Sequence, residues 1–75
     1  MKVGERWRRR TSRANYDDVT GYVQWPNICV IKLIQESRLS HIKGDLVTYY
    51  YPDWPHRASD VMTRANFIKE FEKVY

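Results

Sequence analysis

The sequence lacks the residues on which several classes of protein depend. It has one cysteine, Cys29, so it cannot form an intramolecular disulfide, and a reducing, cytoplasmic setting is expected. It has three glycines, and they form no glycine-rich phosphate loop. The longest apolar run, residues 28–34, contains a lysine and is far shorter than the roughly 20 residues of a transmembrane helix. No apolar stretch follows the basic residues 2–13, so we expect neither a secretory signal nor a membrane partner.

Few side chains are placed to carry catalysis. Cys29, His41 and His56 lack the spacing of metal ligands, so no metal site is predicted. Cys29 lies in the most apolar segment, where a thiol behaves as a small hydrophobic group and stays protonated. Asp17 and Asp18 are adjacent and point to opposite faces of an extended chain, which does not suit an acid–base pair. We therefore predict no enzymatic activity and no cofactor.

What the sequence does contain is a supply of aromatic side chains. A chain of this length buries only about 60% of the surface that its unfolded form exposes, so residues 1–75 are expected to form one small domain. Aromatic residues make up 15% of the chain, and each ring buries roughly 150–250 Å². A few rings can thus replace a larger aliphatic core, and a folded domain is expected.

Residues 27–35 have the strongest strand pattern. A strand that is apolar on both faces is expected to lie centrally in a sheet. Residues 18–24 and 46–51 predict two more strands, and Gly21 indicates a bulge or bend in the first of them. The two predicted faces of the strongest strand are Ile28, Val30 and Ile34 on one side, and Cys29, Ile31 and Leu33 on the other.

Residues 5–10 predict an edge strand or a half-exposed strand. Alternation places Arg6, Arg8 and Arg10 on one face, and Trp7 on the other face as the only core residue of the segment. Arginines at an edge also discourage strand pairing between molecules. Residues 11–15 are polar and predict a turn.

The end of the chain changes to helical spacing. Thr63 or Asn66 is the predicted N-cap of the helix, and residues 52–59, with two prolines, are predicted to form a loop. The expected fold is mainly β with α: a small SH3-like barrel or twisted antiparallel sheet of four to five strands, plus a short C-terminal helix. The helical face is predicted from Phe67, Ile68, Phe71, Val74 and Tyr75.

Positive charge is concentrated in the opening segment. Residues 1–13 carry six basic and one acidic side chain, a net charge of +5, whereas the other 62 residues carry seven basic and eight acidic side chains, a net charge of −1. Arginine forms paired hydrogen bonds with phosphate and stacks on bases. The alternative is a solvated strand whose arginines pair with the chain's own acids, such as Asp17, Asp18 and Glu36. The candidate residues for nucleic acid or another anionic partner are Arg6, Arg8, Arg9, Arg10 and Arg13.

The stretch "LVTYYYPDWP" is a second candidate site. Tyr49 and Tyr51 share one face of a strand, and Tyr50 takes the opposite face, so at least one of the three meets solvent unless both faces of the strand are covered. Tyrosine, tryptophan and arginine dominate protein–protein hot spots. Tyr50, Trp54 and Arg57 are therefore candidate partner-binding residues. The alternative is that Tyr49, Tyr51 and Trp54 only fill a small core.

Both ends of the chain resemble a group of very short phage and prophage proteins. The matching residues are the opening Gly4-Glu5-Arg6-Trp7 and the closing segment Phe67 to Phe71 within "NFIKEFEKVY". The resemblance covers about 20 residues, and the aromatic-rich middle fits only in character. It implies a phage or prophage origin and an SH3-like sheet, and it supplies no catalytic residues.

Three functions remain open from the sequence. The first is a phage accessory protein in the host cytoplasm that docks on a host protein or nucleoprotein complex, including as an inhibitor of host defence. The second is a nucleic-acid-binding module that uses the N-terminal arginine strand, with Trp7 or Tyr50 stacking on bases. The third is a homodimer that buries residues 49–54 against its own copy. Salt dependence separates the first two, because phosphate contacts weaken linearly with log salt.

Overall fold

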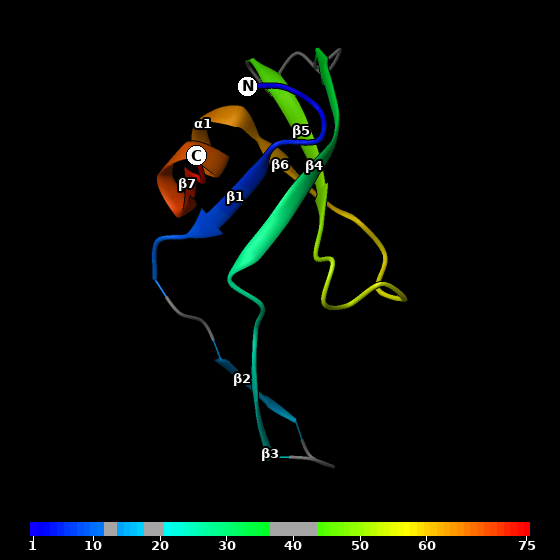
Figure 1. The fold of residues 1–75 in the computed structure, drawn as a ribbon, viewed down its shortest axis with the longest axis vertical. Coiled ribbons are helices and arrows are strands. Elements are labelled where there is room, and N and C mark those ends of the chain that lie inside the picture. Colours follow the sequence, from blue (N-terminus) through cyan, green and yellow to red (C-terminus); the bar gives the residue numbers. More distant parts are fainter. Residues whose placement is uncertain (12–13, 18–20, 37–43) are drawn as a thin grey trace.

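A five-stranded antiparallel sheet forms the body of the protein (Figure 1). The computed structural model describes residues 1–11, 14–17, 21–36 and 44–75. The strand order is β6-β5-β4-β1-β7, and the sheet does not close, so β6 and β7 are its edges. The prediction of a mainly β fold with a short C-terminal helix is confirmed at this level. The strands are β1 (Arg6–Arg9), β4 (Ile28–Glu36), β5 (Asp45–Tyr50), β6 (Asp60–Thr63) and β7 (Phe71–Lys73).

Two further strands, β2 (Ala14–Asp17) and β3 (Gly21–Gln24), pair with each other in a ribbon that projects from the body (Figure 1). The predicted turn at residues 11–15 was therefore wrong at Ala14 and Asn15, which pair with Gln24 and Val23. Gly21 starts β3 with a φ of 82°, a conformation that costs glycine little. Of the strand predicted at residues 18–24, the first three residues lie outside the described part of the chain.

β4 lies in the centre of the sheet, between β5 and β1, as predicted. Its register with β5 shifts between Ile31 and Leu33, which marks a β-bulge. A bulge adds one residue to a strand and reverses the alternation of faces beyond it. Ile34 therefore packs against the core, whereas Leu33 is 45% exposed. The predicted faces of this strand were wrong at these two residues.

The helix α1 (Arg64–Glu70) begins at the predicted cap, Thr63, whose hydroxyl accepts a hydrogen bond from the backbone N–H of Asn66 at 3.3 Å. It ends earlier than predicted, because residues after Glu70 pair with β1 as strand β7. Phe71 takes extended backbone angles, and the ladder to β1 supplies hydrogen-bond partners that a longer helix would have provided internally. No helix in the described ranges is long and apolar enough to cross a membrane.

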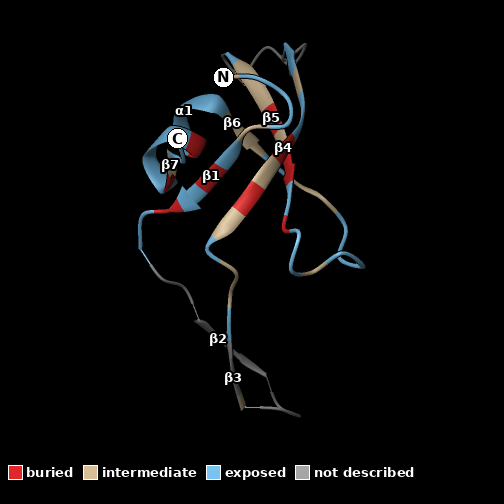
Figure 2. Cartoon of the chain, in the orientation of Figure 1, coloured by how far each residue is buried: buried red, intermediate tan, exposed pale blue. Residues whose placement is uncertain are grey.

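The core lies between α1 and one face of the sheet, which we call the inner face (Figure 2). Three rings form its centre: the ring of Tyr49 is 5.3 Å from that of Phe67 and 5.5 Å from that of Phe71, and the two phenylalanines stack at 4.7 Å. Aromatic pairs at such separations are favourable beyond the area they bury. The buried hydrophobic residues are Trp7, Cys29, Ile31, Val47, Tyr49, Tyr51, Phe67 and Phe71.

β1 is an internal strand that is exposed on one face, so the predicted edge strand was wrong and the alternative, a half-exposed strand, is confirmed. It pairs with β4 on one side and with β7 on the other, and β7 comes from the segment that was predicted to be helical. Trp7 is buried, as predicted, but it is not the only inward residue of the strand. Arg9 also points inward and is only 8% exposed.

The packing of α1 can be tested with two neighbouring residues of the helix. Phe67 is fully buried, so Phe67→Ala should lower the free energy of unfolding by about 3–5 kcal/mol, from lost burial and a new cavity. Ile68 is 43% exposed, so Ile68→Ala should change it by less than about 0.5 kcal/mol. Urea denaturation measures both values. Equal losses in the two variants would contradict this orientation of the helix.

Candidate functional site

Two arginines of the opening segment form ion pairs with one acid of β7. Arg8 donates to Oε1 of Glu72 from Nε at 3.1 Å and from Nη2 at 2.7 Å, and Nη1 of Arg10 lies 3.7 Å from Oε2 of the same carboxylate. Arg8 and Glu72 are directly opposite each other in the ladder between β1 and β7. The Arg8 hydrogen bond and charge lower the pKa of Glu72. Internal pairing, one of the two alternatives from the sequence, therefore occurs, but with an acid that the sequence did not indicate.

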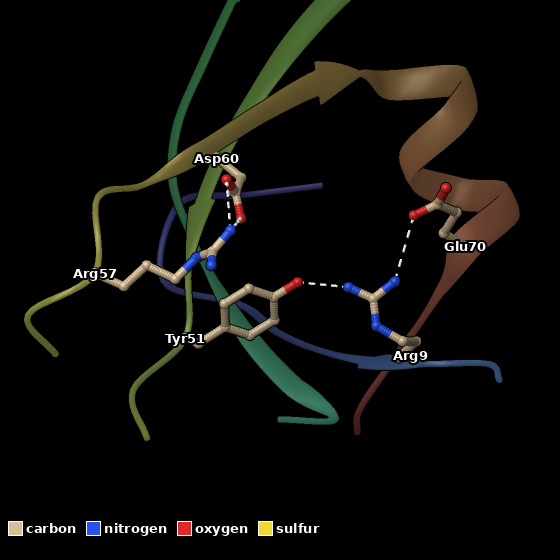
Figure 3. A network of polar contacts seen from close by, with 5 residues as sticks. All are labelled: Arg9, Tyr51, Arg57, Asp60 and Glu70. Carbon is tan, nitrogen blue, oxygen red and sulfur yellow. Dashed lines mark hydrogen bonds and ion pairs between the residues drawn. The ribbon is translucent and has the colours of Figure 1, made fainter. Parts of the chain in front are cut away.

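Arg9 is held inside the protein by three elements (Figure 3). Its Nη2 donates a hydrogen bond to the hydroxyl of Tyr51, and its Nη1 lies 3.4 Å from Oε2 of Glu70. The ring of Phe71 lies 4.5 Å from the guanidinium carbon. The buried Nε has no hydrogen-bond partner among the described residues. Arg9 thus connects β1, the end of β5 and α1, and it does not face an anionic partner.

Arg6 differs from these arginines, because no ion pair links its side chain to another described residue. It lies on the face of the sheet opposite α1, which we call the outer face, where β1 pairs Arg6 with Val30 of β4. A shallow depression of about 240 Å³ opens beside it. The depression is lined by Arg6, Ile28, Pro52 and Asp53. Arg13, the last of the predicted arginines, lies outside the described residues.

The outer face carries exposed apolar side chains over three strands. Leu33, Tyr50 and Val61 are 45%, 38% and 57% exposed. Paired residues of an antiparallel ladder share a face, and Leu33 pairs with Thr48, which pairs with Val61. Tyr50 lies on the opposite face from Tyr49 and Tyr51, as the alternation of the three tyrosines predicted; it is exposed, while Tyr49 and Tyr51 are buried on the inner face.

Residues 51–57 form two successive turns. The carbonyl of Tyr51 accepts a hydrogen bond from the N–H of Trp54 at 2.9 Å, and the carbonyl of Trp54 accepts one from the N–H of Arg57 at 3.1 Å. Pro52 and Pro55 occupy the second position of each turn, where the fixed φ of proline fits. The loop predicted at residues 52–59 is confirmed, and its three-residue spacing brings Tyr51, Trp54 and Arg57 together.

Trp25 completes an aromatic cluster with two of these residues. The rings of Trp25, Tyr51 and Trp54, which we call the aromatic box, lie 5.2–6.0 Å apart at interplanar angles of 58–78°. The guanidinium carbon of Arg57 is 4.3 Å from the ring centre of Trp25 and 5.6 Å from that of Trp54. Such cation–π contacts contribute about 0.5–2 kcal/mol each. Nη2 of Arg57 also lies 3.4 Å from both carboxylate oxygens of Asp60 (Figure 3).

The structure brings together two of the three predicted partner-binding residues. Trp54 and Arg57 meet at the aromatic box, whereas Tyr50 lies on the outer face. Trp54 is half-buried and packs against the core. It therefore contributes to the core, which was one alternative from the sequence, and keeps part of its ring exposed for a partner, which was the other. Trp25 was missed, and the only indication of its role in the sequence is that both Trp25 and Trp54 precede a proline.

Comparison with protein-family models, with curated proteins and with solved structures finds no match to this chain. Within the described ranges, no three side chains of histidine, cysteine, aspartate or glutamate lie close enough to hold one metal ion. The arrangement that the described residues offer is a surface of apolar, aromatic and guanidinium groups, which is suited to binding.

Cys29 is fully buried, and burial raises the pKa of its thiol to about 12. We expect a thiol reagent such as Ellman's reagent to leave Cys29 unmodified in the native protein and to modify it rapidly in urea, because the thiolate is the reactive form. The absorbance of the released thiol measures the rate. Rapid modification without denaturant would contradict the buried position of Cys29.

Glu5 forms a third ion pair between β7 and the start of the chain, in addition to the two at Glu72. Its Oε2 lies 2.9 Å from Nζ of Lys73, and its Oε1 accepts a hydrogen bond from the backbone N–H of Lys2 at 2.9 Å and another from the indole of Trp7 at 3.4 Å. The Lys73 hydrogen bond is the largest cause that lowers the pKa of Glu5 to about 2, and the Lys2 backbone contact follows it.

The Glu5 ion pair predicts an acid-dependent loss of stability. Because the carboxyl pKa falls from 4.5 to about 2 on folding, its contribution is fully present above about pH 4.5 and is lost as the pH falls toward about 2. The stability difference between wild type and Glu5→Gln, from urea denaturation, should shrink over this range. In a Lys73→Met background the change should be much smaller. A difference that does not vary with pH would exclude the ion pair.

Proposed function

We propose that this chain is a non-enzymatic binding protein that docks on another protein through its outer face and the adjoining double turn. The observation that carries the proposal is that α1 covers only one face of the sheet, while the other face exposes Leu33, Tyr50 and Val61. Exposed aromatic and aliphatic side chains next to an arginine are typical of the centre of a protein interface. Pro52 and Asp53 line the depression beside Arg6, so the double turn borders the outer face.

In its finer form, the proposal is a phage or prophage accessory protein in the host cytoplasm. It would dock on a host protein or nucleoprotein complex, including as an inhibitor of host defence. The support is the resemblance of Gly4 to Trp7 and of Phe67 to Phe71 to short phage proteins. An SH3-like identity of the fold belongs to the same proposal, and the small antiparallel sheet with one short helix between β6 and β7 favours it.

Direct nucleic-acid binding by β1 is the alternative. Its support is the net charge of +5 in residues 1–13. A phosphate would have to compete with Glu72 for Arg8 and Arg10, and Arg9 is buried. Of the two stacking residues considered from the sequence, Trp7 is buried against Phe67 of α1, whereas Tyr50 is exposed on the outer face. Protein docking is therefore the better supported function.

The outer face can be tested with one charge change at two places. Val61 is exposed on β6, and Ile68 is exposed on α1, so Val61→Lys and Ile68→Lys add the same charge on opposite sides of the fold. Tagged protein is incubated with host lysate, with and without nuclease. We expect Val61→Lys to weaken capture of a defined protein by roughly tenfold or more, because it places a charge inside an apolar contact. Ile68→Lys should leave capture unchanged.

Three results would overturn the docking proposal. Loss of the captured band on nuclease treatment, together with oligonucleotide affinity that falls linearly in log salt, would favour the nucleic-acid alternative. Light scattering that gives a dimer in wild type and a monomer in Val61→Lys would assign the outer face to a homodimer. Equal capture by both lysine variants would remove the outer face from the interface.

A further inference from the structure

We propose that the aromatic box is a receptor for an arginine side chain of a protein partner, and that Arg57 occupies it in the free protein. This inference rests on the proposed docking function and names the chemistry that the partner supplies. In the free protein the guanidinium of Arg57 would act as an internal competitor, which a partner's arginine replaces.

The geometry of the rings is that of a cation site. Trp25, Tyr51 and Trp54 are steeply inclined to one another, with interplanar angles of 58°, 78° and 68°, so they form walls and do not stack as parallel plates. Ring faces carry negative electrostatic potential and attract a cation within about 6 Å of the centroid. The guanidinium of Arg57 satisfies this distance to two walls, at 4.3 Å and 5.6 Å.

The occupant is held loosely. Arg57 contacts Asp60 through one nitrogen at 3.4 Å, longer than the 2.7–2.9 Å typical of a charge-assisted hydrogen bond. By contrast, Arg8 reaches Glu72 at 2.7 Å. The side chain of Arg57 is 38% exposed, so water can solvate it when it leaves. The turn that ends at Arg57 is held by its backbone N–H, and the departure of the side chain breaks no bond of the loop backbone.

The walls are fixed independently of their occupant. Tyr51 is buried and accepts a hydrogen bond from Arg9. Trp54 stands between Pro52 and Pro55 and packs against the core, as does Trp25. A site whose walls are ordered in advance loses little entropy when a ligand enters. The box should therefore persist when Arg57 is removed.

The box and its rim select arginine among charged side chains. Asp60, whose carboxylate contacts the Arg57 guanidinium, supplies two oxygens on which an incoming guanidinium can place two donors while its plane lies against the rings. A lysine ammonium is more strongly hydrated and presents no planar face. Aspartate, glutamate and phosphate would be repelled by both the ring faces and Asp60.

The test removes the internal competitor and offers arginine as a small probe. Arg57→Ala is titrated with N-acetyl-arginine methylamide, and the indole N–H resonances of Trp25 and Trp54 are followed by NMR. We expect saturable shifts and an affinity at least about tenfold higher than in wild type, because the competitor is gone. The uncharged isostere N-acetyl-citrulline methylamide should not bind, and Trp54→Leu in the Arg57→Ala background should abolish binding.

Arg64→Ala is the matched control. Arg64 is also an exposed arginine in a single long ion pair, at 3.3 Å from Asp45, but it lies on α1 away from the box. This variant should bind the probe as weakly as wild type. An equal gain in affinity for the probe in Arg57→Ala and Arg64→Ala would mean that the affinity depends only on the net charge of the protein, which would contradict the proposal.

Two other results would also overturn the proposal. The first is a folded Arg57→Ala protein that shows no saturable shift with the probe. The second is loss of the folded indole resonances both in Arg57→Ala and in Arg57→Met, which keeps the apolar stem, because Arg57 would then be a structural part of the box. The docking proposal can fail separately. If the probe binds but Val61→Lys does not weaken capture, the aromatic box is an arginine site and the outer face is not the docking surface.

Discussion

The pairing of β1 with β7 joins the two ends of the chain, and most other features of the fold depend on it. It makes β1 an internal strand and places Phe71 opposite Arg9, so the last core ring reaches the inner face. It also brings Glu72 opposite Arg8, and Lys73 near Glu5. A contact between residues more than 60 positions apart is slow to form in a folding chain, because the loop between them must close first. The ion pairs across β1 and β7 reinforce a contact that has this entropic cost.

The same pairing changes the meaning of the basic opening segment. Taken alone, a run of arginines indicates an anionic partner. In the fold, the acids of the C-terminal segment meet these arginines, and Glu72 alone contacts both Arg8 and Arg10. Exposed ion pairs of this kind contribute little to stability, roughly 0–1 kcal/mol, but they occupy the donors that a phosphate would need. Much of the positive charge of residues 1–13 is thus paired with acidic side chains of the same molecule.

Patterns among residues close together in the sequence correctly predicted the features of the fold that depend only on such residues. The alternation of Tyr49, Tyr50 and Tyr51 predicted that Tyr50 lies on the opposite face from the other two rings, because successive side chains of a strand point to opposite faces. Thr63 was predicted as one of two helix caps because its hydroxyl acts within one turn. Both depend only on residues a few positions away.

The features that the sequence did not predict all depend on distant partners. Phe71 fits the helical spacing that starts at Phe67, but pairing with β1 overrides this preference. The bulge after Ile31 depends on the register with β5, and a one-residue slip moves Leu33 and Ile34 to opposite faces. Trp25 meets Trp54 because β4 and β5 are neighbours, so the sequence indicated Trp54 and Arg57 of the candidate cation site but not Trp25.

Arg9 and Arg57 show how burial separates two arginines that have similar contacts. Each guanidinium lies within 5 Å of an aromatic ring centre and near one carboxylate at 3.4 Å. Arg9 is almost fully buried and hydrogen-bonded to Tyr51, so its departure would leave the core with an empty polar site, and its charge has no easy path to water. Arg57 is partly solvated where it lies, and a guanidinium that replaces it can form the same contacts with the rings and with Asp60. Exchangeable cation binding is therefore expected at the double turn, while the arginine of β1 that points inward serves the fold.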